Sequence, residues 1–83
     1  MDASALKQLR KSLDLTQAEM AERIGMTLRP YAELESGRSE FRLIHARAAE
    51  RAALEVAIER GNPMLAPTSI RREALDLARL ITG

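Results

Sequence analysis

The chain has 83 residues, of which 46% are hydrophobic, and a chain this short has room for one small hydrophobic core. It contains no cysteine and only one histidine, which excludes disulfides, structural zinc sites and cysteine nucleophiles. Thirteen basic and twelve acidic side chains give a net charge of +1, so charge alone identifies no partner. The scarcity of aromatic residues favours an all-helical fold.

A stripe of leucines at helical spacing predicts a first helix over residues 3–13. The stripe consists of Leu6, Leu9 and Leu13. Either Asp2 or Ser4 is suited to cap the helix, because a short polar side chain can accept a hydrogen bond from a free backbone N–H at the helix start.

Two further helices are predicted from their caps and glycines. Thr16 and Glu19 form a T-x-x-E capping box, which predicts a second helix that runs to Ile24 and is terminated by Gly25. Thr27 is expected to cap a third helix, which Gly37 ends. Because only one residue separates Gly25 from Thr27, the turn between these helices must be tight.

The second half of the chain has a simpler pattern. Residues 39–60 are predicted to form one long Ala-rich helix, which is followed by a linker over residues 61–67 that contains Gly and Pro. The last predicted helix covers residues 68–82 and has one apolar face, formed by Ile70, Ala74, Leu77, Ala78 and Ile81.

The stretch over residues 16–37 predicts a helix-turn-helix arrangement, because two short capped helices joined by a tight glycine turn must cross at a steep angle. At this point the sequence resembles the lambda-repressor-like family of bacterial and phage regulators, also called the XRE or Cro/C1 type. The resemblance covers residues 5–38 and depends on Leu6, Leu9, Arg10, Leu15, Thr16, Gln17, Ala21, Gly25, Leu34, Glu35, Ser36 and Gly37.

The resemblance implies a fold and a function. The fold is an all-α, five-helix lambda-repressor-like domain, in which residues 1–38 form the helix-turn-helix core. The implied function is a sequence-specific transcriptional regulator that binds a pseudo-palindromic operator in double-stranded DNA as a homodimer, and that represses transcription and regulates its own promoter. RNA polymerase or another protein is a possible further partner.

Two oppositely charged residues are expected to pair inside the core. Helical geometry places Arg10 beside the leucine stripe of the first helix and Glu35 close to the buried side of the third, on which Tyr31 is central. We therefore predict an Arg10–Glu35 ion pair with a structural role.

The third helix is the candidate for contact with DNA bases. Arg29 points away from the buried side and can present two donors to guanine. Leu28 is a weaker candidate for a thymine methyl group, and Glu33 for a cytosine amino group or for orienting Arg29. The resemblance implies that Gln17 lies near the DNA backbone and the edge of the site.

Further polar residues around this helix are suited to phosphate contacts, although each alone could be an ordinary surface side chain. The predicted phosphate contacts are Lys7, Thr16, Gln17, Ser36, Arg38, Ser39 and Arg42.

The predicted dimer interface lies in the last two long helices, and its candidate residues are Leu54, Ile58, Leu75 and Leu80. A compact monomer, in which the five helices cover one another, is the alternative. A second alternative for function is an antitoxin-like or adaptor subunit whose C-terminal helices bind a partner protein.

An enzyme is not expected, because the sequence has no phosphate loop, no metal-ligand set and no recognisable nucleophile with a histidine base. No cofactor is predicted. The N-terminus lacks a basic stretch followed by an apolar run, and no segment approaches the roughly 18 apolar residues of a membrane span. A cytoplasmic location is therefore expected.

Overall fold

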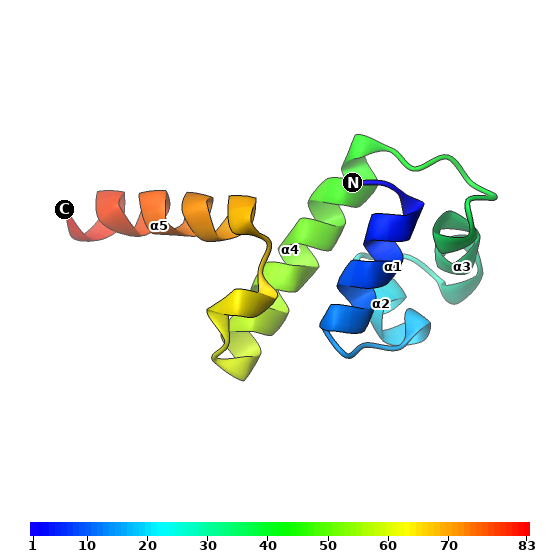
Figure 1. Ribbon diagram of the computed structural model, residues 1–83, viewed down its shortest axis with the longest axis horizontal. Coiled ribbons are helices and arrows are strands. Elements are labelled where there is room, and N and C mark those ends of the chain that lie inside the picture. The colour runs from blue at the N-terminus through cyan, green and yellow to red at the C-terminus, as the bar shows by residue number, and fades with distance from the viewer.

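The structure is a computed structural model that describes residues 1–83, and all of its regular secondary structure is helical (Figure 1). This confirms the predicted all-helical fold class. The elements in chain order are α1 (Ala3–Ser12), α2 (Gln17–Arg23), α3 (Leu28–Ser36), α4 (Leu43–Arg60), the short 3-10 helix η1 (Pro63–Leu65) and α5 (Thr68–Thr82). None of the helices is both long and apolar enough to span a membrane.

The helix ends follow the local sequence closely. Asp2 caps α1, since its carboxylate accepts a hydrogen bond of 2.8 Å from the backbone N–H of Ala5. At the start of α2, the Thr16 hydroxyl accepts from the N–H of Glu19 and the Glu19 carboxylate accepts from the N–H of Thr16. Thr27 precedes α3 as expected, but its side chain makes no capping hydrogen bond.

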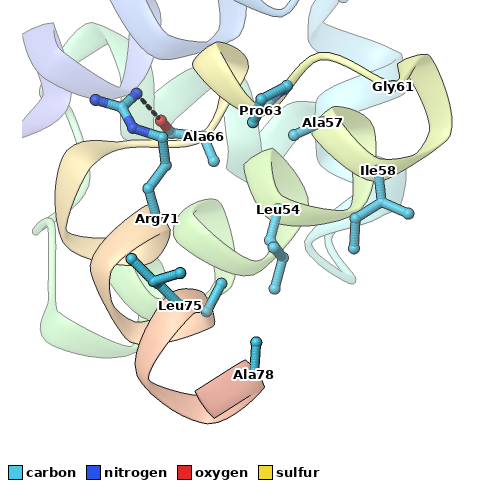
Figure 2. Close-up of a pocket in the computed structure, with 10 residues that line it drawn as sticks. Leu54, Ala57, Ile58, Gly61, Pro63, Ala66, Arg71, Leu75 and Ala78 are labelled. Atoms are coloured by element: carbon cyan, nitrogen blue, oxygen red, sulfur yellow. Dashed lines mark hydrogen bonds between the residues drawn. The ribbon is translucent and has the colours of Figure 1, made fainter. Parts of the chain in front are cut away.

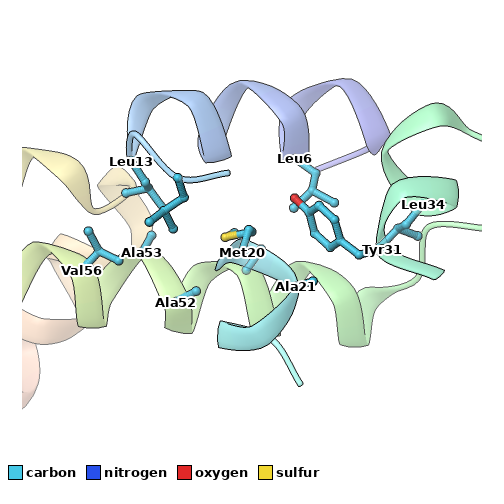
Figure 3. Packing of buried hydrophobic residues seen from close by; sticks show 11 residues of the cluster. Leu6, Leu13, Met20, Ala21, Tyr31, Leu34, Ala52, Ala53 and Val56 are labelled. Atoms are coloured by element: carbon cyan, nitrogen blue, oxygen red, sulfur yellow. The ribbon is translucent and has the colours of Figure 1, made fainter. Parts of the chain in front are cut away.

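The core lies where α1, α2 and α3 pack against α4 (Figure 3). Each of the first three helices contributes large side chains, whereas α4 contributes mostly alanines, which allow the other helices to approach its backbone closely. The buried cluster consists of Leu6, Leu13, Leu15, Met20, Ala21, Tyr31, Leu34, Ala49, Ala52, Ala53 and Val56.

Helix α4 begins at Leu43, four residues later than predicted. The residues before it form an irregular connection in which Arg42 is extended, and its backbone N–H donates a 2.9 Å hydrogen bond to Nδ1 of His45. The ring of Phe41 packs against the core and lies 5.7 Å from the His45 ring. These contacts favour an extended entry to the helix, which the Ala-rich pattern further along does not indicate.

The C-terminal helix is separated from this core. The predicted linker contains η1, which packs against α4, and α5 then projects away from the rest of the molecule (Figure 1). No residue of α5 is buried. The arrangement therefore differs from the compact monomer that the sequence left open as an alternative.

Candidate nucleic-acid interface

The tight turn between α2 and α3 fixes how α3 is presented. Gly25 adopts the left-handed conformation with φ 79°, and the N–H of Met26 donates a 2.8 Å hydrogen bond to the carbonyl of Ala21. Tyr31 and Leu34 anchor α3 in the core, and this turns the opposite side of the helix outward.

A buried ion pair connects α1 to α3. Nε of Arg10 lies 2.7 Å from Oε2 of Glu35, and its Nη2 donates a second hydrogen bond of 3.1 Å to Oε1. The Glu35 side chain is only 3% exposed and that of Arg10 13% exposed. Nη1 of Arg10 also donates to the carbonyl of Leu15 at 2.9 Å, so the guanidinium joins both ends of the helix-turn-helix to α1.

Gln17, at the start of α2, is the third member of this group. Its side-chain amide donates a 3.3 Å hydrogen bond to Oε1 of Glu35. Burial acts to raise the pKa of the Glu35 carboxyl, but the hydrogen bonds from Arg10, with smaller contributions from the neighbouring Tyr31 phenol and from Gln17, outweigh it, and the pKa is lowered. Burial, with a smaller contribution from the neighbouring Glu35, raises the pKa of the Tyr31 phenol.

The outward side of α3 carries the residues predicted to contact bases. The Arg29 side chain is 91% exposed, and its Nε lies 3.6 Å from Oε1 of Glu33, one helical turn later. Leu28 is half exposed at the start of the helix. A shallow hollow of about 300 Å³ runs along this side, and it is lined by Arg29, Ala32, Glu33, Ser36 and Arg38.

Some of the predicted phosphate contacts are exposed in the structure, and others already make hydrogen bonds or ion pairs with neighbouring residues. Arg38 is exposed just beyond the end of α3, and Lys7 is exposed on α1. The Ser36 hydroxyl donates to the carbonyl of Glu33 at 3.0 Å, and the N–H of Ser39, which is partly buried, donates to the same carbonyl. Arg42 lies farther along the connection, with its Nε 3.4 Å from a carboxylate oxygen of Glu40.

Two contacts have no counterpart in the sequence reasoning. One is the hydrogen bond from Gln17 to Glu35, and the other is an ion pair that joins α2 to α4, in which Nη2 of Arg23 lies 2.6 Å from Oε1 of Glu59. The latter two residues are 36 positions apart, so no local spacing predicts their meeting. Both contacts help to fix α2 against its neighbours.

A family model described as helix-turn-helix matches residues 6–52, which is more than half of the chain. The chain belongs to this helix-turn-helix family. The match confirms the resemblance to lambda-repressor-like, or XRE-type, regulators, and it covers most of α1, all of α2 and α3, and about the first half of α4. The general function follows: this is a DNA-binding protein of a family that regulates transcription.

Comparison with curated proteins and with solved structures gives no match for this helix-turn-helix protein. The family match ends within α4, so it does not include η1 or α5. The operator, the dimer and the direction of regulation must therefore be argued from the residues themselves.

Proposed function

We propose that this helix-turn-helix protein is a sequence-specific regulator that binds a pseudo-palindromic operator as a homodimer, with α3 in the major groove. The observation that supports it best is the outward side of α3, where a nearly fully exposed guanidinium projects from a helix that is anchored by buried residues. A rigid helix with an exposed arginine near its N-terminus is suited to contact base edges.

Arg29 is the proposed guanine contact. Its two terminal nitrogens can donate to O6 and N7 of one guanine, while Glu33 holds the guanidinium from one turn further along α3. Leu28, at the start of the helix, is placed to contact a thymine methyl group. Removal of the Glu33 carboxylate should therefore weaken the preference for guanine and, because a negative charge is lost near the DNA, strengthen non-specific binding.

Phosphate contacts would position α3 on the duplex. Arg38 and Ser36 flank the hollow beside Arg29, and Lys7, Thr16, Ser39 and Arg42 are the further candidates. Gln17 is already bonded to Glu35, so one amide hydrogen is engaged, while its second amide hydrogen and the backbone at the start of α2 remain suited to a phosphate.

A two-fold dimer would place two α3 helices about one turn of DNA apart, or roughly 34 Å. The proposed interface residues are Leu54 on α4, partly buried, and the exposed Ile58, Leu75 and Leu80. Binding over a promoter would repress transcription by blocking RNA polymerase, and control of its own promoter fits a small regulator of this type.

The experiment that tests this proposal is selection of a random duplex library on the purified protein at near-physiological salt. We expect enrichment of a palindrome whose half-sites lie about one helical turn apart and contain a guanine. The same selection with Arg29→Ala should lose the guanine, whereas Arg72→Ala, a change on exposed α5, should select the same palindrome. A folded protein that enriches no sequence would contradict the proposal.

The uncovered apolar side of α5 favours one other function, that of an antitoxin-like or adaptor subunit bound to a partner protein. This function predicts weak or absent salt-dependent DNA binding and a defined complex with a co-purifying partner protein. Salt titration of DNA binding separates the two functions, because phosphate contacts make the affinity fall steeply with salt.

A further inference from the structure

Contacts at the base of α5 join it to the linker. Nη1 of Arg71, in the first turn of α5, donates a 2.8 Å hydrogen bond to the carbonyl of Ala66, and Nη2 donates to the Thr68 hydroxyl at 3.1 Å. Ala66 is only 4% exposed, and the neighbouring Leu65 packs against the core. The linker is therefore attached to the body of the protein at one end and to α5 at the other.

Most of the apolar side of α5 is uncovered in the single chain. Ile70 at its start is partly buried, but the large side chains farther along α5 are more than half exposed, with Leu77 at 58%, Ile81 at 75% and Leu80 at 82%. Ile58 on α4 is 71% exposed and faces the same region. Contiguous exposed apolar surface of this kind marks an interaction site in a soluble protein.

The angle between α4 and α5 forms an apolar groove (Figure 2). It consists of two adjoining hollows of about 550 and 330 Å³, and both are lined by Leu54, Ile58, Ala74 and Ala78. The only charged residues along them are Arg71 in the first and Glu73 in the second. An apolar helix of about 15 residues, which is some 22 Å long, is the kind of segment that would fill such a groove.

The exposed area of the chain indicates how large the missing cover is. A compact monomer of 9.2 kDa is expected to expose about 4,900 Å². The chain exposes 5675 Å², which is roughly 750 Å² more. This excess is close to the ~800 Å² that each partner buries in a stable protein–protein interface of standard size.

We infer that the groove between α4 and α5 is occupied by α5 of a second copy, so that two copies exchange their last helices. The inference rests on the homodimer of the proposed function and specifies how it is built. A two-fold interface requires that one surface carry both the protruding and the receiving parts. Here Leu77 and Ile81 protrude from α5, while Ala57, Ala74 and Ala78 leave room between the two helices.

Disulfide cross-linking between differently labelled copies tests this arrangement, because the natural chain has no cysteine. One copy carries Ile58→Cys in α4, the other carries Leu77→Cys in α5, and the two are mixed and oxidised. Helix exchange brings these positions together across copies, so we expect roughly tenfold more of this mixed disulfide than of a control pair. The control replaces Ile58→Cys with Leu43→Cys, which lies at the other end of α4 and is similarly exposed.

The outcomes separate the possible arrangements. Disulfides only between two Leu77→Cys copies would show that the α5 helices pair outside the groove, and equal yields with the control would show random collision. Either result overturns the exchange.

Light scattering on the unmodified protein and on Ile81→Glu gives an independent measurement. Ile81 is exposed in the single chain, so the variant should fold, but a charge buried in the groove should weaken dimerisation by roughly a hundredfold. Arg72→Ala, on the opposite side of α5, should leave the dimer unchanged. A monomeric natural protein that still enriches single DNA half-sites would overturn the exchange and leave DNA recognition intact. A cross-linked dimer that enriches no DNA sequence would support the exchange and contradict the proposed DNA recognition.

Discussion

Replacement of Glu35 by alanine is the most informative test of how the helix-turn-helix is held together. The substitution removes the carboxylate that accepts two hydrogen bonds from Arg10 and one from Gln17. It leaves the Arg10 guanidinium in a site where only 13% of its side chain is exposed. The expected consequence is a charge without its partner between α1 and α3.

The size of the effect follows from this geometry. Loss of one partner from a buried ion pair costs about 3–5 kcal/mol. We expect the lower end, about 3 kcal/mol, because Arg10 keeps its hydrogen bond to Leu15 and some access to water. In a domain of this size that change lowers the Tm by roughly 12–24 °C. It would remove a large part of a total stability of about 4–12 kcal/mol.

The assay is a double-mutant cycle followed by urea and thermal unfolding. Arg10→Met combined with Glu35→Leu removes both charges and replaces them with apolar groups of similar size. We expect the double variant to unfold within about 1 kcal/mol of the natural protein, although each single variant loses several times more. The difference measures the coupling between the two side chains.

Two results would refute this reasoning. A Glu35→Ala variant with the Tm of the natural protein would mean that the pair contributes nothing to the fold. A double variant that loses the full sum of the two single effects would mean that the two side chains act independently and that the cost does not come from an unpaired buried charge.

Four further predictions concern stability and DNA binding. Because folding lowers the pKa of Glu35 below its ordinary 4.5, the stability that the ionised Glu35 contributes is fully present above pH 4.5 and is lost as the pH falls through the lowered pKa. Glu35→Gln should therefore flatten the acid side of a curve of stability against pH. Thr16→Ala should lower the Tm by about 4–8 °C through loss of the capping box, whereas Thr27→Ala, whose hydroxyl makes no cap, should change it less. With the selected operator, Arg29→Ala should lose about 1–3 kcal/mol of binding at one guanine in each half-site, and substitution of that base should then cost the variant nothing more. Arg38→Ala should weaken binding to all sequences alike and reduce the slope of log K against log salt by about 1; an unchanged slope would exclude a phosphate contact.

The parts of the fold that could be predicted from the sequence are those with local causes. The caps and glycines of α1 to α3 act within a few residues, so the capping box at Thr16 and the turn at Gly25 are legible along the chain. The Ala-rich pattern predicts the start of α4 too early, because the packing of Phe41 and the hydrogen bond to His45 set the true start. Alanine content in the middle of a helix does not specify where the helix begins.

In the candidate site, too, the sequence predicts the features that depend on one helix and misses those that depend on how helices pack. Helical periodicity was enough to place Arg10 and Glu35 on facing sides and Arg29 outward, because each inference needs only the angle of a residue around its own helix. The third member of the buried group could not be inferred in this way. Gln17 meets Glu35 only because α2 and α3 cross where they do, and the crossing is a property of the packed core.

For the last helix, the sequence predicts the helix but not what covers its apolar face. The sequence pattern predicts an amphipathic helix at the correct residues, but an apolar face does not indicate which segment packs against it. In the single chain the N-terminal three helices already occupy the alanine-rich side of α4, which leaves Leu54 and Ile58 directed toward an α5 that reaches outward. The bond from Arg71 to the carbonyl of Ala66 holds the linker to α5, and the groove between α4 and α5 stays open in the single chain. We propose that an identical helix fills it. The same exchange would couple the two DNA-binding halves through α4, which is shared by the core and the groove.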